Sequence, residues 1–405
     1  MKTKFLLLLL LVGLVNFSCS DDNDDPVVIL KADKLSINEG KVGDEVVLTG
    51  EGFSENKEEN IVSFNEVQAT ILQASASELK VTVPEGATTG KLTVKVAEKS
   101  IDFGVFTVRR ETLFMIKSDY SGEVDKETLI TMDPTTGEEQ IYCELPAFGA
   151  NWLYSSITYL AKTNELAILA ISEESGKDVG LCMVNLETKV CSKVELEGED
   201  RYYYYDLFSD KEDNLYATKC PDMSQDHVYM MKIDPSTGTQ KVFQEYSDSY
   251  SFGLPIYFEE ANEVVVMIAD DYDYSVSRLG KINMENGTKS DINLKETGNY
   301  QGLTADKDNN LYFIKKDRGQ DEAVGIKLNL ETGKEETFIK FQETNHYLGK
   351  PIYFQTTNEL LYLPEDNGDS TLYLLKVNLD NKSILKIELN PGENIYYGNM
   401  IPLYM

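Results

Sequence analysis

The sequence predicts an all-β protein, with a small β-sandwich at residues 28–109 and a six-bladed β-propeller at residues 110–405. The first segment alternates apolar and polar side chains between glycine-rich turns, as strands of a sandwich do. The second repeats a short turn sequence about every fifty residues, a period that fits one four-stranded blade. The C-terminus resembles the start of the internal repeats, so it is expected to close the propeller.

The first 18 residues have the parts of a secretory signal peptide. Two lysines precede an apolar run at residues 5–15, and Cys19 stands directly after a small residue. The run is too short for a retained membrane helix. The arrangement resembles the lipobox of bacterial lipoproteins, although Asn16 replaces the usual aliphatic residue. The resemblance implies that Cys19 is acylated and anchors the chain, and secretion without a lipid is the alternative.

Residues 19–27 are acidic and contain nothing to bury, which predicts a solvated tether. Lipoproteins on the outer face of the outer membrane of Bacteroidota have a similar acidic stretch after the cysteine. The resemblance implies an outer-membrane, cell-surface location, and a plain spacer is the alternative.

Residues 28–109 contain the turns and strands of a recognisable module. The segment opens at residues 38–53 with closely spaced glycines, and its later strands alternate with period two. The pattern continues at residues 62–64, 69–71, 79–84, 86–87 and 90–96. It resembles an IPT/TIG domain, which implies an immunoglobulin-like sandwich. Its position between tether and propeller favours a spacer.

The repeat after residue 110 is marked by two turn sequences in the same register. An Asp/Asn-x-x-x-Gly turn, or a shortened version, recurs six times, at residues 133–137, 185–188, 234–238, 283–287, 329–333 and 378–381. A second tight turn recurs five times, at residues 164–166, 213–215, 262–264, 309–311 and 358–360. The missing sixth copy predicts that residues 113–116 form a second strand and that residues 396–404 supply its inner neighbour.

The charge and the cysteines exclude several classes of function. A formal charge of −31 argues against nucleic acid and against binding anionic surfaces, because both need a positive patch. The four cysteines after Cys19 have no metal-ligand spacing. Cys182 and Cys191 flank a predicted hairpin turn, so they either bridge it or remain isolated thiols.

No catalytic, metal or cofactor site is predicted. The two histidines, His227 and His346, fall in different blades without an accompanying motif. Residues 306–310 resemble the start of a calcium loop, but their place on a tight turn favours turn chemistry.

Aromatic side chains recur just before the predicted inner strands, on the face that surrounds the mouth of the propeller channel. The predicted ligand-binding residues are Trp152, Tyr154, Tyr204, Tyr205, Phe252, Tyr300, Tyr347 and Tyr397. Such rings suit a flat or ring-shaped ligand. The alternative is that they pack between blades.

The predicted loops between second and third strands are rich in carboxylates, which disfavour polyanionic ligands. They carry Asp119, Glu123, Asp125, Glu173, Glu174, Asp178, Asp270, Asp271, Asp273, Asp317, Asp321, Glu322, Glu365, Asp366 and Asp369. A solvated rim explains most of them. A neutral sugar, a corrinoid or a cation-bearing ligand fits this mouth better than an acidic polymer.

The whole arrangement resembles surface lipoproteins of Bacteroidota that capture nutrients for an outer-membrane transporter. The resemblance implies a non-enzymatic protein that binds a glycan or other small ligand and hands it to a TonB-dependent transporter. Two alternatives stay open: a propeller hydrolase or lyase that uses paired carboxylates, and a module that binds a protein partner.

Overall fold

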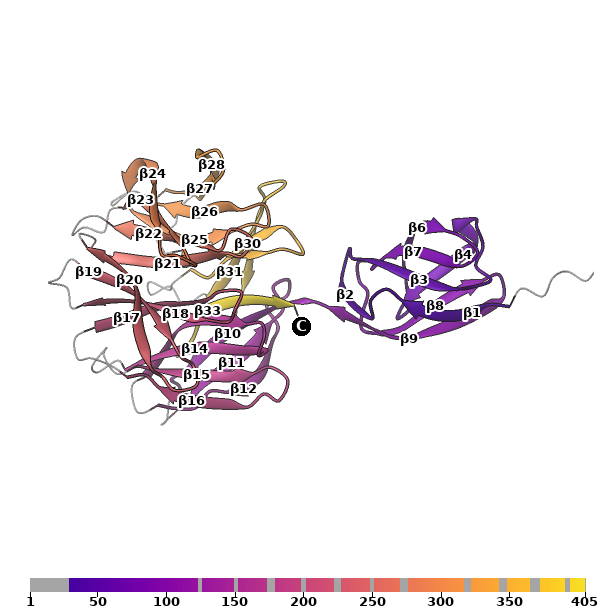
Figure 1. The fold of residues 1–405 in the computed structure, drawn as a ribbon, viewed down its shortest axis with the longest axis horizontal. Helices are drawn as coiled ribbons and strands as arrows, with labels where there is room; N and C mark the ends of the chain where they lie inside the picture. The colour runs from indigo at the N-terminus through magenta and orange to yellow at the C-terminus, as the bar shows by residue number, and fades with distance from the viewer. Residues whose placement is uncertain are drawn as a thin grey trace, which may run out of the picture. The chain divides into compact units, whose positions relative to one another are not determined.

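The protein is described here by a computed structural model. It describes residues 29–122, 126–148, 152–172, 179–197, 202–221, 227–247, 251–269, 276–316, 322–341, 348–364, 372–389 and 394–404. The predicted signal peptide, Cys19 and the whole acidic tether lie outside these ranges. The chain forms two compact units, and the boundary between them in the sequence falls between Arg109 and Arg110 (Figure 1). Within the described ranges every regular element is a strand, apart from one short 3-10 turn, η1 (Lys57–Glu59).

The N-terminal unit is a sandwich of two sheets. Its strands are β1 (Lys31–Leu35), β2 (Glu39–Lys41), β3 (Glu45–Glu51), β4 (Asn60–Phe64), β5 (Val67–Gln68), β6 (Thr70–Ala74), β7 (Glu78–Thr82), β8 (Gly90–Val96) and β9 (Lys99–Arg109). One sheet has the order β1-β3-β7-β6 and the other β2-β9-β8-β4-β5. Only β2 and β9 pair in parallel among these strands.

Period-two alternation builds the core of this sandwich. Val46 and Leu48 of β3 are fully buried, while Val47 and Thr49, which alternate with them, are only partly buried. Phe64 and Phe106 meet edge to face, with ring centroids 4.9 Å apart. Gly50 is required where β1 and β3 approach, because a Cβ there would lie 2.3 Å from the Lys31 carbonyl oxygen.

The second unit contains six four-stranded sheets, numbered here in chain order. Sheet 1 holds β10 (Glu111–Asp119), β11 (Lys126–Met132), β12 (Glu139–Glu144) and the last strand, β33 (Ile395–Tyr404). Sheet 2 holds β13 (Trp152–Leu160), β14 (Glu165–Ser172), β15 (Val179–Asn185) and β16 (Cys191–Glu195), and sheet 3 holds β17 (Tyr202–Ser209), β18 (Leu215–Pro221), β19 (His227–Ile233) and β20 (Gln240–Ser247).

The remaining three sheets repeat this order. Sheet 4 holds β21 (Ser251–Phe258), β22 (Glu263–Ala269), β23 (Val276–Asn283) and β24 (Lys289–Gly298). Sheet 5 holds β25 (Tyr300–Ala305), β26 (Asn310–Lys315), β27 (Ala323–Asn329) and β28 (Lys334–Phe341), and sheet 6 holds β29 (Ile352–Phe354), β30 (Glu359–Tyr362), β31 (Tyr373–Asn378) and β32 (Ile384–Glu388).

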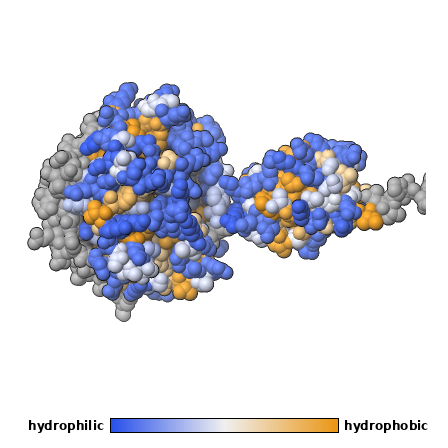
Figure 2. Space-filling view, viewed as in Figure 1, coloured by the Kyte–Doolittle hydropathy of each residue, from blue (hydrophilic) through white to orange (hydrophobic). Residues whose placement is uncertain are grey.

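In these sheets the middle strands are buried and the outermost strand is more exposed. Nearly all of β14 and β26 is buried, whereas β12 and β32 are largely exposed. A strand buried on both faces reads as a continuous apolar run, as in 165–172. The face seen in Figure 2 is mainly hydrophilic, with apolar residues in small patches, as expected for a chain of charge −31.

Apolar clusters join each sheet to the next. Separate clusters connect sheets 1 and 2, 2 and 3, 3 and 4, 4 and 5, and 5 and 6. A further cluster packs Leu113 and Met115 of sheet 1 against Phe354 and Leu361 of sheet 6. Each sheet thus shares an apolar cluster with the next, and sheet 6 shares one with sheet 1.

The C-terminal strand completes sheet 1. β33 pairs antiparallel with β10, and Leu113 lies opposite Pro402 and Ile116 opposite Gly398. Figure 1 shows the two strands side by side although they come from opposite ends of the unit. This is the pairing that the missing turn predicted. Without β33, the inner edge of β10 would have no hydrogen-bonding partner.

The predicted turns form by local side-chain hydrogen bonds. Asp133 Oδ1 accepts from the backbone N–H of Thr135 at 2.7 Å, and Gly137 has a φ of +76°. Asp306 Oδ1 accepts from the backbone N–H of Asn310 at 2.9 Å, and its Oδ2 accepts from the Tyr312 hydroxyl at 2.9 Å. Turn chemistry therefore accounts for residues 306–310, as predicted.

Candidate functional site

The inner strands of the second unit share one irregularity, a β-bulge partway along their pairing with the second strand. At each register shift, one or two residues of the inner strand have no partner on the second strand. They are Asn399 in β33, Ser155 in β13, Tyr205 and Asp206 in β17, Leu254 and Pro255 in β21, and Gly302 in β25. In sheet 6 the inner strand is short, and Lys350 precedes it at the corresponding place. We call these residues, with Lys350, the bulge ring. A bulge turns its extra residue away from the regular pleat.

An ion pair shows where the bulge ring faces. Lys350 Nζ lies 3.9 Å from Asp206 Oδ1. Asp206 belongs to sheet 3 and Lys350 precedes the inner strand of sheet 6. Counted along the shared apolar clusters, two other sheets separate sheets 3 and 6 on each side. A contact between opposite sheets crosses the interior, so both side chains reach into the space that the inner strands surround.

Close packing of neighbouring inner strands shapes this interior. Gly302 has a φ of +60°, and a Cβ there would lie 2.3 Å from Pro351 Cδ. Asn399, with a φ of +43°, donates from its side-chain amide to the Tyr154 carbonyl oxygen at 3.1 Å. The bulges are thus held by contacts between adjacent sheets.

Two polar atoms beside the bulge ring lack hydrogen-bond partners in the described part of the chain. They are Ser155 Oγ and Gln301 Oε1, both inaccessible to solvent. A buried polar atom without a partner costs free energy, so such atoms usually mark the place of a water or a ligand. Asp206 is 20% exposed and Tyr205 is 48% exposed, so part of the ring stays open.

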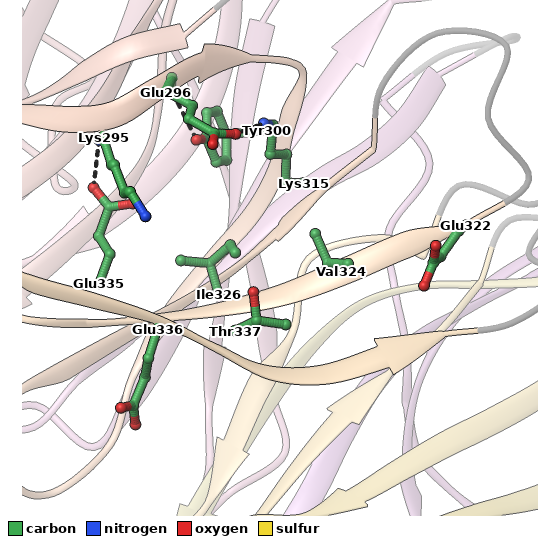
Figure 3. A pocket seen from close by; sticks show the side chains of 10 residues that line it. All are labelled: Lys295, Glu296, Tyr300, Lys315, Glu322, Val324, Ile326, Glu335, Glu336 and Thr337. Atoms are coloured by element: carbon green, nitrogen blue, oxygen red, sulfur yellow. Dashed lines mark hydrogen bonds and ion pairs between the residues drawn. The ribbon is translucent and has the colours of Figure 1, made fainter.

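A separate cavity of about 310 Å³ lies between sheets 4 and 5 (Figure 3). Lys315 pairs with Glu296, which lowers the pKa of that carboxyl group. Glu335 accepts from the backbone N–H of Lys295 at 2.7 Å. Its lining is charged, and Lys315, Glu296 and Glu335 already have partners, so it offers a ligand less than the bulge ring does.

Three of the predicted ligand-binding tyrosines are buried between sheets. Tyr154 is 7% exposed, in the cluster that joins sheets 1 and 2, and its hydroxyl donates to the Pro146 carbonyl oxygen at 2.5 Å. Tyr204 is 2% exposed, between sheets 2 and 3, and its hydroxyl donates to Gln240 Oε1 at 2.8 Å. Burial raises the pKa of Tyr154. These contacts favour a packing role for both rings.

Tyr300 packs in the same way between sheets 4 and 5. Its ring meets Phe313 edge to face at 5.3 Å, and its hydroxyl donates to the Glu296 carbonyl oxygen at 2.8 Å. It also lines the cavity of Figure 3. The sequence analysis placed these aromatic residues before the inner strands, whereas Tyr154, Tyr204 and Tyr300 lie within β13, β17 and β25.

The other predicted ligand residues differ in position. Tyr205 belongs to the bulge ring. Tyr397 is half-buried, and its hydroxyl donates to Glu139 Oε2 at 2.5 Å. Trp152 and Phe252 lie in inner strands, but their side chains fall outside the described structure, as does all of Tyr347. Ligand contact by the eight aromatic residues stays a prediction.

The sequence analysis did not select Ser155, Asp206, Gln301 or Lys350. A signal for them exists, because each follows an aromatic or glycine residue at the point where the strand alternation breaks. The aromatic residues are the more visible repeat in the sequence, and most of these polar residues stand directly behind them.

The predicted acidic rim is described only in part. Asp119 Oδ1 accepts from the backbone N–H of Ser121 at 2.9 Å, and hydrogen bonds from Ser121 lower the pKa of Asp119. Glu322 pairs with Lys340 at 2.9 Å. The other thirteen carboxylates predicted there lie outside the described ranges.

The described ranges contain neither a metal cluster nor a membrane-spanning helix. They hold no group of three or more His, Cys, Asp or Glu side chains arranged for a metal ion. Of the two histidines, His227 begins β19 and His346 lies outside the described residues. No helix in the described ranges is long and apolar enough to cross a membrane.

Comparisons with known proteins support the fold of both units. Residues 32–109 match the IPT/TIG domain family, as the sequence predicted. No curated protein matches the chain. TolB from Acinetobacter baumannii resembles the structure with a TM-score of 0.53 and 11% identity, over 84% of this chain and 83% of that one. A chain of a nidogen/laminin complex resembles the structure with a TM-score of 0.53 and 12% identity, over 72% of this chain and 98% of that one.

An auxiliary nutrient-binding protein from Bacteroides thetaiotaomicron is also similar. It gives a TM-score of 0.39 and 11% identity, over 92% of this chain and 99% of that one. A TM-score this low carries no argument about function. TolB and the nidogen/laminin chain bear on the fold alone, because their identities are low.

Proposed function

We propose that this chain is a cell-surface, lipid-anchored nutrient-binding protein that captures a neutral glycan or similar small ligand at the bulge ring. The observation that carries the proposal is the interior ion pair between Asp206 and Lys350, beside two partnerless buried polar atoms. In this proposal the ligand passes to an outer-membrane TonB-dependent transporter, and the protein does not transform it.

The chemistry of the bulge ring suits a ligand with many hydroxyl groups. Ser155 offers a hydroxyl and Gln301 an amide oxygen, while Asp206 accepts and Lys350 donates hydrogen bonds. Tyr205 adds an exposed ring on which a sugar face can stack. A charge of −31 disfavours polyanionic ligands, which would be repelled before they reached the ring.

The proposal also assigns roles to the rest of the chain. The six sheets form a closed six-bladed propeller, and β33 is the strand that closes it. The IPT/TIG domain and the acidic tether at residues 19–27 hold the propeller away from the membrane. The acyl chains on Cys19 supply the attachment.

Binding at the bulge ring can be tested by titrating the protein with neutral oligosaccharides and with cobalamin. We expect Asp206→Asn and Ser155→Ala each to weaken binding by about 1 to 3 kcal/mol, because the first removes a charged acceptor and the second removes a hydroxyl group from the ring. Trp152, the only tryptophan, provides a fluorescence readout. Glu212→Gln is the matched control, since Glu212 lies on an exposed turn and pairs with Lys162.

Three outcomes would contradict this proposal. Unchanged affinity in both bulge-ring variants would place the ligand elsewhere. Chromatography that finds the oligosaccharide cleaved after incubation would favour the enzyme alternative. A lack of response to every small ligand would favour the protein-interaction module.

The lipid anchor makes a prediction about localisation. Cys19→Ala should move the protein from the membrane fraction to the soluble fraction, because the acyl chains are its proposed membrane attachment. Cell fractionation followed by immunoblotting measures the shift, and Ser20→Ala serves as the neighbouring control. A Cys19→Ala protein that stays with the membrane would show that something other than the lipid holds it there.

A further inference from the structure

Two cysteines from different sheets lie close enough to react with each other. Cys143 is on β12, the outermost strand of sheet 1, and Cys191 is on β16, the outermost strand of sheet 2. Their Sγ atoms are 3.3 Å apart. A disulfide bond has an S–S distance of about 2.0 Å, so a small side-chain rotation brings the sulfurs to bonding distance.

The sequence analysis considered a different pair, Cys182 and Cys191. In the hairpin of β15 and β16, Cys182 lies opposite Lys193 and Cys191 lies opposite Val184, so the two cysteines are not cross-strand partners. The Cys182 side chain also contacts Cys191, but it is fully buried. Cys143 and Cys191 are both partly exposed, so an oxidant has access to this pair.

We propose that Cys143 and Cys191 form a disulfide bond in the exported protein, and that this bond joins the outer edges of the first two blades. The predicted signal peptide would take the chain to compartments where disulfides persist. The bond would close a loop that contains β13, β14 and β15, next to the sheet that receives the C-terminal strand.

The reaction uses a disulfide as oxidant, either glutathione disulfide or a thiol–disulfide oxidoreductase. The Cys191 thiolate attacks one sulfur of the oxidant, which breaks the oxidant's S–S bond and releases its first thiol. The Cys143 thiolate then attacks Cys191 Sγ, which forms the new bond and releases the second thiol. Two electrons and two protons pass from the cysteines to the oxidant.

The environment of the pair indicates a structural bond and not a rapidly exchanging one. Burial raises the pKa of the Cys143 thiol to about 12, and the neighbouring Cys191 adds to this effect. A thiol with a high pKa is a poor leaving group, so an attacking thiolate displaces Cys143 from the disulfide slowly. Burial also raises the pKa of Cys182, the thiol beside the bond, so little of it is the nucleophilic thiolate that could reopen the bond.

The test is to incubate the full chain with a mixture of oxidised and reduced glutathione and to digest it with trypsin without reduction. Trypsin separates the three cysteines into peptides 127–162, 178–189 and 190–193. We expect mass spectrometry to find 127–162 linked to 190–193. The link should persist in Cys182→Ala and disappear in Cys143→Ser.

Thermal unfolding gives a second readout. The melting temperature of the oxidised protein should fall by about 4 to 8 °C on adding dithiothreitol, since a disulfide restricts the unfolded chain. That of Cys143→Ser should not respond to the reductant. A peptide 178–189 linked to 190–193, or free thiols at Cys143 and Cys191 after oxidation, would overturn the proposal.

Discussion

A chain truncated after Pro391 should lose the cooperative unfolding of its C-terminal unit. The truncation removes β33, which pairs with β10 along residues 111–119. It leaves β10 with an open hydrogen-bonding edge and uncovers the apolar cluster between sheets 1 and 6. We therefore expect aggregation, or a broad low-temperature transition in calorimetry. In contrast, the N-terminal unit should unfold as before, because it has its own core.

The matched control for this truncation removes only Met405. This control keeps β33, which ends at Tyr404. It should melt like the full-length protein. If the chain truncated after Pro391 also melts like the full-length protein, the proposed closure of the propeller by β33 is wrong.

Tyr204→Ala should destabilise the protein by about 3 to 5 kcal/mol, as do other substitutions that empty a buried aromatic site. Tyr204 fills the space between sheets 2 and 3. Its removal also leaves Gln240 without the hydroxyl that donates to it. The midpoint of urea unfolding, with the slope of the transition unchanged, measures the loss.

The adjacent residue provides the matched control. Tyr205→Ala should change stability by no more than about 0.5 kcal/mol, because Tyr205 is 48% exposed on a bulge. Ligand affinity should show the opposite order, with Tyr205→Ala weakening binding more than Tyr204→Ala does. A stable Tyr204→Ala protein that has lost binding would instead support the aromatic mouth that the sequence analysis proposed.

Features that depend on a few neighbouring residues could be predicted from the sequence. The Asp133 and Asp306 turns form through side chains that bond backbone groups two to four residues away. The repeat of these turns predicted one four-stranded blade for each copy, and the second unit contains six four-stranded sheets. The absence of one turn gave the pairing of β33 with β10. The IPT/TIG match followed from glycines and strand alternation within residues 32–109.

The candidate site depends on features that periodicity hides. A bulge adds one residue to a strand and reverses the alternation beyond it. Tyr204 and Tyr205 are neighbours in sequence, yet one packs between sheets and the other is exposed. The sequence prediction placed both among the ligand residues, because it put the run of tyrosines before the inner strand, whereas both residues lie within β17.

The sequence by itself determined the two units, the repeat, the turns and the C-terminal pairing, because each follows from local hydrogen bonding or from a repeated pattern. Only the tertiary structure decided which side chains meet across sheets. The contact of Asp206 with Lys350 and that of Cys143 with Cys191 each join residues of different sheets. Such contacts depend on how the sheets pack on one another, and no spacing within the chain encodes them.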